Sequence, residues 1–575
     1  MPEPAELGAK VLLKGGSIVN HDSITKADIL IQHGIISAIA ENIDPPTDTN
    51  VVDVDGKYVL PGGIDLDCHL SIYSQDDPVA DTYETGSACA LLGGTTTIVN
   101  TIYVEPDARI TEAFEQFIAT AKGQFKCDYA VCIRLPCFND TVANDLNDLV
   151  RNHGMCLVQL QQGETSGPGD LDDKCLNHAL RVCRNNGILP VIVAKTSPQL
   201  FSMLKENLIR KYPEMGPELY QYSQMESAER DTIQRATMHA FHGGPVCPIL
   251  VTRIQSSAAL ECFLSQRRKC RATVFGQITI GAIAAPLAAN VIKPGDKSAI
   301  FTTSANWDEA LGFVTEPPFR PDEKLSETLL TAIQNENGLS VGSGHYALGS
   351  KDKETFINHR KGDAPRGIAA VGCRLPVLWN CGVDNGMDLC SFVRATSTEP
   401  ARLINIYPQK GRIDVGSDAD LVVWGKTDDV DNYKTLLPQT AYNPFTGIPL
   451  KMKPWLVILG GMIVVNKEEL VTNIGNVGKY IPVKPFGEYV FGRMKAMDTT
   501  IAMEKVRLDR EPYSGKVMCM TSDDSRADGS NKEHHLYRKE YYDNQPKIAY
   551  PPGQRPVHTS VRTAQPPGGA SQGFW

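Results

Sequence analysis

The alternation of short apolar runs with amphipathic segments limits the folds available to this chain more than any other feature. Apolar runs such as 188–194 and 249–251 are continuous and lack the period-two pattern of a half-exposed strand. Between such runs, segments such as 110–121 gather apolar residues on one helical face. Continuous apolar strands alternating with helices are typical of a parallel sheet covered by helices. Because the pattern extends over residues 66–405, we expect an α/β fold with a (β/α)8 barrel.

The two ends of the folded body have a different pattern. Residues 1–65 and 406–490 contain short apolar runs separated by turn residues. In the first segment, the pairs Gly15-Gly16, His33-Gly34 and Asp55-Gly56 each predict a hairpin turn. We therefore expect both chain ends to build one β-sandwich domain.

The C-terminal residues have the composition of a disordered tail. After a helical extension predicted over 491–515, residues 516–575 begin with a mixed charged stretch. From Gln545 to Trp575 there are six prolines, three basic residues and no acidic residue. So few apolar residues cannot offset the entropy cost of ordering, which predicts a disordered, Pro-rich and partly basic tail over 516–575.

Charge, hydropathy and cysteine usage exclude several protein classes. A formal net charge of −10 disfavours nonspecific nucleic-acid binding. No segment approaches the roughly 18 uninterrupted apolar residues of a membrane helix, and the N-terminus lacks a secretory signal pattern. The 15 cysteines are scattered without a C-x-x-C pair, which favours reduced thiols. We expect a cytoplasmic protein with no nucleic-acid partner and no membrane span.

Seven strings follow one another in order along the chain: PGGID, ALLGGTTTIVN, PPFRPD, CRLPVLW, ATSTEPARLINIYPQKGRIDVGSDADLVVW, NPFTGIPL and GKYIPVKPFGEYVFGRM. In this order they resemble the dihydropyrimidinase branch of the cyclic amidohydrolases, from about residue 10 to about residue 515. The C-terminal extension, with PPGG near its end and a final Trp, resembles the collapsin response mediator proteins. The resemblance implies a TIM-like barrel of the amidohydrolase type flanked by a β-sandwich.

The resemblance also implies a two-metal hydrolytic site, most of whose ligand positions are altered in this chain. The enzymes hold a hydroxide between two metals, which polarise a cyclic amide. Their ligands are an H-x-H motif, a carboxylated lysine, two further histidines and an aspartate. The matching positions are Asp67, His69, Gln159, Val193, Arg253 and Gly344.

Only two of these six positions carry residues able to bind a metal. Asp67 and His69 are possible ligands. Gln159 cannot be carboxylated, and Arg253 places a fixed positive charge where a dication would lie. Gly344 replaces the residue that also acts as general base in the enzymes. We therefore predict no bound metal, no cofactor and no catalytic residue.

Other polar residues near these positions are predicted to be structural. We expect the Asp67 carboxylate to lie within about 4 Å of the Arg253 guanidinium as an ion pair. His69 is expected to be a hydrogen-bonded barrel residue. His345 and the pair His534-His535 fit no metal spacing and are expected to be either structural or merely solvated. Glu164 stands where the resemblance places a substrate-facing tyrosine.

The resemblance implies a non-catalytic scaffold of neurons. It implies a cytoplasmic homotetramer that associates with tubulin, microtubules and cytoskeletal or motor adaptor proteins in axon outgrowth, axon guidance and neuronal polarity. The basic tail over 545–575 is expected to bind an acidic partner such as tubulin. Protein kinases could act on the tail, although it has no Ser-Pro or Thr-Pro dipeptide and Ser197-Pro198 lies in the barrel.

Two alternatives remain open from the sequence. One is an active metal-dependent cyclic amidohydrolase with a reorganised site, built on Asp67 and His69. The other is a small-molecule sensor that uses the emptied pocket, where Arg253 and Glu164 offer charges to a polar ligand.

Overall fold

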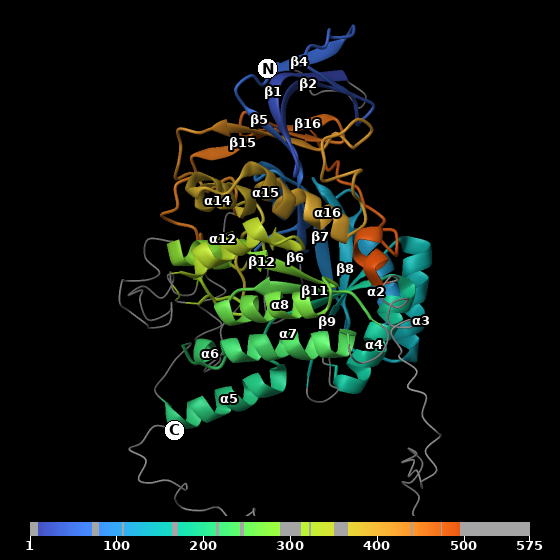
Figure 1. The fold of residues 1–575 in the computed structure, drawn as a ribbon, viewed down its shortest axis with the longest axis vertical. Helices are drawn as coiled ribbons and strands as arrows, with labels where there is room; N and C mark the ends of the chain where they lie inside the picture. Colours follow the sequence, from blue (N-terminus) through green and yellow to red (C-terminus); the bar gives the residue numbers. More distant parts are fainter. Residues whose placement is uncertain are drawn as a thin grey trace, which may run out of the picture. The chain divides into compact units, whose positions relative to one another are not determined.

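Eight strands form a parallel, nearly closed barrel (Figure 1). The computed structural model describes residues 10–71, 80–105, 108–163, 171–213, 218–241, 246–287, 312–320, 322, 324–349, 366–438, 441–472 and 474–494. The barrel strands, each parallel to the next, are β6 (Gly63–Cys68), β7 (Thr95–Tyr103), β8 (Asp128–Arg134), β9 (Leu157–Leu160), β10 (Leu189–Val193), β11 (Ile249–Ile254), β12 (Val274–Thr279) and β13 (Leu339–Gly342). The predicted barrel is confirmed.

Backbone hydrogen bonds close the barrel beyond the carboxyl ends of its first and last strands. The His69 amide donates to the His345 carbonyl at 2.9 Å, and the His345 amide donates to the Asp67 carbonyl at 3.3 Å. These bonds join the end of β6 to the segment after β13. Closure therefore brings Asp67, His69 and Gly344 to one junction.

Helices follow the strands and cover the barrel. They are α1 (Tyr83–Leu92), α2 (Ile110–Ala121), α3 (Asp140–Asp148), α4 (Asp173–Asn186), α5 (Pro198–Lys211), α6 (Glu218–Tyr222), α7 (Glu226–Phe241), α8 (Ser257–Lys269), α9 (Ile280–Ala284), α12 (Leu325–Asn335), α14 (Arg374–Cys381), α15 (Leu389–Val393) and α16 (Glu399–Leu403). Local signals explain their bounds. The Asp172 side chain caps α4 by accepting from the Cys175 amide at 2.8 Å, and Gly187 ends α4 with a φ of 69°.

Strands from both chain ends form a separate nine-stranded mixed sheet. The N-terminal strands are β1 (Lys10–Val19), β2 (Ile24–Gln32), β3 (Ile35–Ala40), β4 (Thr49–Asp53) and β5 (Tyr58–Pro61). The C-terminal strands are β14 (Leu421–Lys426), β15 (Met452–Leu459), β16 (Met462–Asn466) and β17 (Glu469–Leu470). Antiparallel pairing of β5 with β14 joins the two sets, and Val11, Ile29, Val423 and Leu456 belong to their shared core. The predicted joint domain is confirmed.

Two of the three predicted hairpin turns in this sheet are wrong. Only His33-Gly34 connects antiparallel neighbours, β2 and β3. Gly15-Gly16 lies inside β1 at a bulge, where a side chain on Gly16 would come within 2.7 Å of Val59 Cγ2. Asp55-Gly56 separates β4 from β5, but each of these strands pairs in parallel with β1. The turn residues at Gly15-Gly16 and Asp55-Gly56 predicted a reversal into a neighbouring antiparallel strand. The first pair instead forms a bulge within β1, and the second joins two strands that both pair with β1.

Several predictions fall outside the described residues. These are the tail over 516–575, Glu164 and the pair His534-His535. In the described parts of the chain, no helix combines the length and the hydropathy that crossing a membrane requires.

Candidate functional site

The structure places the six predicted positions along the carboxyl ends of the barrel strands. Asp67, His69 and Arg253 contact one another directly. A Cβ atom on Gly344 would lie 3.8 Å from Asp67 Oδ2. Gln159 and Val193 line a separate small cavity of about 10 Å³ beside Lys195. Four of the six positions therefore share one cluster.

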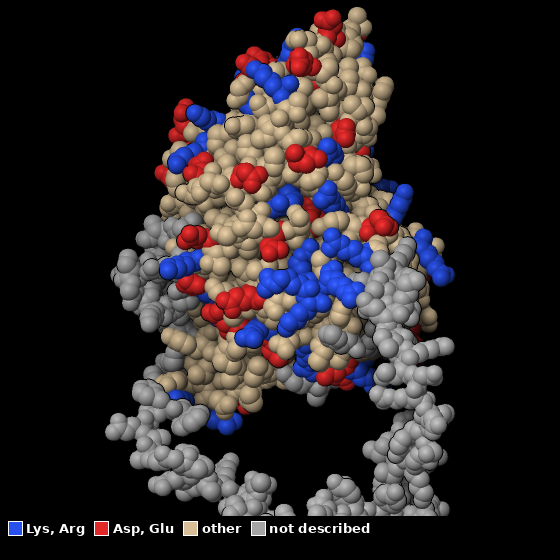
Figure 2. Space-filling view, viewed as in Figure 1, with Lys and Arg blue, Asp and Glu red and all other residues tan. Residues whose placement is uncertain are grey.

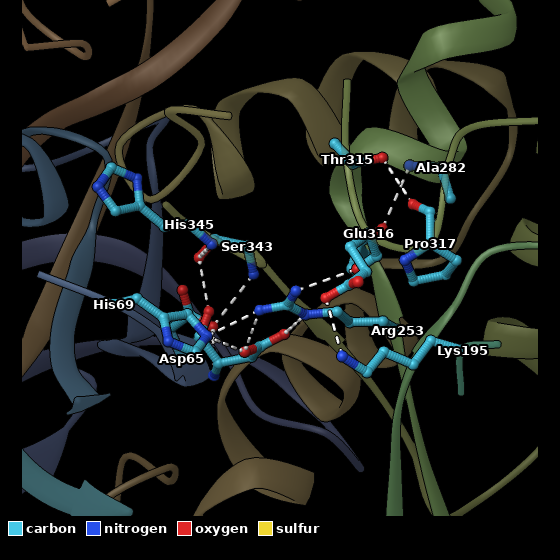
Figure 3. A network of polar contacts seen from close by, with 12 residues as sticks. Asp65, His69, Lys195, Arg253, Ala282, Thr315, Glu316, Pro317, Ser343 and His345 are labelled. Atoms are coloured by element: carbon cyan, nitrogen blue, oxygen red, sulfur yellow. Dashed lines mark hydrogen bonds and ion pairs between the residues drawn. The ribbon is translucent and has the colours of Figure 1, made fainter. Parts of the chain in front are cut away.

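Arg253 is the centre of this cluster (Figure 3). Its Nε donates to Asp67 Oδ2 at 2.8 Å, and its Nη2 donates to Asp67 Oδ1 at 3.1 Å. The same Nη2 lies 2.7 Å from His69 Nε2, and Nη1 donates to the Glu316 carbonyl oxygen at 3.0 Å. The predicted Asp67–Arg253 ion pair is confirmed, in the two-pronged geometry that favours arginine over lysine.

The backbone of β11 is distorted at Arg253. The residue has a φ of 59°, and the register of β11 against β12 shifts between Val251 and Ile254. A left-handed conformation costs a residue other than glycine about 1 kcal/mol. Such strain is concentrated at functional sites, where surrounding contacts maintain it. Here the four polar contacts of the guanidinium are the contacts that hold it.

Electrostatics fix the ionisation of the cluster. Burial opposes ionisation of Asp67, but Arg253 and His69 outweigh burial and hold the pKa of the Asp67 carboxyl well below its usual range. Burial lowers the pKa of His69, so its ring is neutral at pH 7. Burial also opposes the charge of Arg253, but Asp67 outweighs it and raises the pKa of the guanidinium. The pair is charged throughout the physiological range.

The residues present do not fit a two-metal centre. Both oxygens of Asp67 accept hydrogen bonds from Arg253. His69 Nε2 lies 2.7 Å from an Arg253 donor and 2.8 Å from Asp67 Oδ1, so either its lone pair faces the guanidinium or its proton faces the carboxylate. A dication would have to displace a fixed guanidinium charge from both ligands. Among the described residues, no group of three or more His, Cys, Asp or Glu is arranged to hold a metal ion.

A second charged cluster adjoins the first, and the sequence analysis missed it. Glu316 accepts from Lys195 Nζ at 2.9 Å (Figure 3). It also accepts from Arg366 Nη1 at 2.6 Å. Burial opposes ionisation of Glu316, but Lys195 and Arg366 outweigh it and hold the carboxyl pKa below its usual range. Nearby, Arg134 Nη2 donates to Gln161 Oε1 at 2.6 Å. Arg134 is the last residue of β8 and Lys195 lies two residues beyond β10, so charge at strand ends was the available signal.

His345 has a structural role, in line with the prediction. Its Nδ1 accepts from the Ala370 and Val371 amides at 3.0 and 3.1 Å, so the ring proton lies on Nε2. That proton faces Asp81 Oδ2 at 2.7 Å. His345 therefore links the end of the barrel, through hydrogen bonds, to the segments that contain Asp81 and Ala370-Val371.

Comparisons with known proteins agree with this architecture. The profile described as "Amidohydrolase family" matches residues 347–464. A dihydropyrimidinase of Dictyostelium discoideum is 29% identical over 514 residues, covering 88% of this chain and 96% of that protein. The crystal structure of dihydropyrimidinase from Brevibacillus agri is 25% identical, with a TM-score of 0.74 over 83% of this chain and 99% of that chain. Over most of its length this chain is similar in sequence and fold to dihydropyrimidinases.

Dihydropyrimidinases and dihydropyrimidinase-related proteins match this chain at similar identity. Dihydropyrimidinase-related protein 5 of Rattus norvegicus is 27% identical over 589 residues. That alignment covers 98% of this chain and 99% of the relative. Identity alone does not choose between the enzymes and the related proteins, so the choice depends on the site.

Proposed function

We propose that this chain is a non-catalytic member of the dihydropyrimidinase-like family that acts by binding other proteins. The observation that carries the proposal is the position of the Arg253 guanidinium, which donates to both oxygens of Asp67 and contacts His69. A hydrolytic site of this family needs metal-bound hydroxide and a general base. The cluster offers neither, because Gly344 stands at the position expected for the base.

The proposed role is that of a cytoplasmic scaffold in neurons. We infer a homotetramer that associates with tubulin, microtubules and cytoskeletal or motor adaptor proteins during axon outgrowth, axon guidance and the establishment of neuronal polarity. Support comes from the alignment with dihydropyrimidinase-related protein 5, which spans 98% of this chain, whereas the Dictyostelium enzyme covers 88%. In a symmetric assembly, several copies of a weak binding surface gain avidity.

A basic face is available to an acidic partner. Figure 2 shows Lys and Arg side chains gathered over the region where α8 ends. Arg268, Lys269 and Arg271 are exposed there. Burial, and to a smaller extent the positive charge of nearby Arg493, lowers the pKa of Arg267. Because the whole chain carries a net charge of −10, this local excess of positive charge is distinctive.

A co-sedimentation experiment with microtubules tests the scaffold role. We expect the triple variant Arg268→Glu/Lys269→Glu/Arg271→Glu to reduce pelleting several-fold at low salt, because each change reverses a charge on the basic face. The matched control is Lys14→Glu/Lys122→Glu/Lys174→Glu, which reverses three exposed charges elsewhere. Equal pelleting of both variants and the unmodified chain would rule out this face.

Two further measurements separate the proposal from its alternatives. Removal of residues 545–575 is expected to weaken pelleting, because the removed segment is basic; unchanged pelleting would exclude the tail. Turnover of dihydrouracil or hydantoin by the metal-supplemented chain would instead establish an active hydrolase with a reorganised site.

A further inference from the structure

Among the described residues that cluster around Asp67 and Glu316 at the carboxyl end of the barrel, positive side chains outnumber negative ones. In its described part, four cations accompany two carboxylates in the contacting clusters around Glu316 and Asp67: Arg134, Lys195, Arg253 and Arg366 against Asp67 and Glu316. His69 adds no charge because burial keeps it neutral. Two positive charges are thus left over, in a place where most of these side chains are shielded from water.

The excess charge is concentrated at two residues. Arg253 is paired with Asp67. Arg366 pairs with Glu316 and lies over the rings of Phe201 and Tyr220, at 5.2 and 5.0 Å from their centroids. The two other cations are Arg134 and Lys195, and Lys195 contacts the same Glu316 carboxylate as Arg366.

Arg134 has only neutral partners in the described residues. Its Nη2 donates to Gln161 Oε1, and its guanidinium lies 5.1 Å from the centroid of the Tyr103 ring. Burial lowers the pKa of Lys195 most, and the positive charges of nearby Arg134 and Arg366 lower it further. The Lys195 side chain is 14% exposed, so water screens the repulsion only in part.

Holding like charges together in a sheltered place is unfavourable unless an anion joins them. We propose that the carboxyl end of this barrel binds a small oxyanion, a carboxylate or a phosphate, between Arg134 and Lys195. The planar fork of an arginine suits two oxygens of such a group, while a lysine supplies a point charge. Ligands of barrels of this class bind at the carboxyl ends of the strands, where both residues lie. This binding site is additional to the scaffold role and does not depend on it.

Calorimetric titration of the full chain tests the site. Sodium phosphate and sodium succinate are added separately, at constant ionic strength, to protein in an anion-poor buffer. We expect saturable binding of at least one of them, one per chain, weakened at least tenfold by Arg134→Gln. The matched control, Arg210→Gln, removes an exposed cation of α5 and should bind like the unmodified chain.

Each outcome of the titration either supports or overturns the proposed oxyanion site. Binding of phosphate alone, or of succinate alone, supports the site and identifies the chemical class of its ligand. Absence of saturable binding, or equal binding by Arg134→Gln, would overturn the proposal. If Arg134→Gln does not fold, Lys195→Gln carries the same comparison.

Thermal stability separates a ligand-binding arginine from a structural one. In anion-free buffer, Arg134→Gln should melt at the same temperature as the unmodified chain or higher, because an unpaired charge is removed. Phosphate or succinate, whichever binds, should raise the melting temperature of the unmodified chain but not that of the variant. A lower melting temperature of Arg134→Gln without anion would assign the residue a structural role and contradict the site.

Discussion

Buried charge is used differently at the two ends of the barrel. At the amino end, Lys410 contacts Asp128 at the start of β8, Asp418 and Asp420, and is only 3% exposed. Backbone amides satisfy these carboxylates further: Lys479 donates to Asp128 and Gly460 donates to Asp420. At the carboxyl end, Arg253 holds Asp67 from a distorted backbone, and in the described part of the surrounding clusters cations outnumber carboxylates.

The difference in charge balance distinguishes a cluster that stabilises the fold from one suited to binding. The Lys410 cluster joins the barrel to the mixed sheet, and the lysine charge is balanced by more than one carboxylate, so removing it should affect stability first. The Arg253 cluster stands where barrel enzymes keep their reactive groups. Its excess charge and strain are a cost to stability, which a binding role explains.

The largest expected effect is on the amino-end cluster. Lys410→Met should lower the free energy of unfolding by about 3–5 kcal/mol, because it leaves buried carboxylates without their cation. Urea unfolding monitored by circular dichroism measures it. The matched control is Lys453→Met, since Lys453 is also buried but donates to the Asp429 and Asn432 carbonyls; it should cost about 1 kcal/mol. Equal losses of unfolding free energy in Lys410→Met and Lys453→Met would show that the Lys410 cluster stabilises the fold no more than an ordinary buried lysine.

A smaller loss is expected at the carboxyl end. Arg253→Met should lower the free energy of unfolding by about 2 kcal/mol, because Asp67 loses its partner, but the lost cation is 14% exposed against 3% for Lys410. The same urea experiment compares it with Lys410→Met. A loss as large as that of Lys410→Met would make the two ends equivalent and break the comparison.

Acid should act on the carboxyl-end clusters. The folded-state pKa values of Asp67 and Glu316 lie below their usual ones, so their stabilising contribution is complete above the unfolded pKa of about 4 and is lost as pH falls below it. Urea unfolding at pH values from 7 down to 3 should show stability falling below about pH 4. Asp67→Asn should show a shallower fall; an identical slope would mean that Asp67 is not ionised in the folded chain.

The smallest effect concerns space beside Asp67. Gly344 has a φ of 59°, and a Cβ there would come within 3.2 Å of Thr279 Cγ2. Gly344→Ala should cost about 1 kcal/mol from its backbone conformation, with a further cost from crowding. Gly56→Ala is the control, because Gly56 has a φ of 71° and open space around it. If both variants lose the same stability, the junction has room for a larger side chain.

Much of the fold could be predicted because its signals are local. Strands such as β10 are buried on both faces and therefore read as continuous apolar runs. Gly154 and Gly187, which end helices at positive φ, are local signals of the same kind. The parallel pairing of β4 and β5 with β1 could not be predicted, because turn residues signal a change of direction but not the strand that is joined afterwards.

The candidate site was predictable where family positions could be matched in the sequence. Matching placed Asp67, His69 and Arg253 together, which the contacts confirm. Glu316 comes from a segment with no strand pattern, and its contacts with Lys195 and Arg366 join residues far apart in the chain, so no local signal indicates them. Arg134 and Lys195 did carry a signal, a charge at the end of a buried strand.

The most direct test of the central claim is the metal content of the purified full chain, measured per chain by elemental analysis after equilibration with zinc and manganese. Because Arg253 occupies the ligand atoms of Asp67 and His69, we expect values near zero, unchanged by added metal. Stoichiometric metal, about one or two ions per chain as in a working site of this chemistry, would contradict the account.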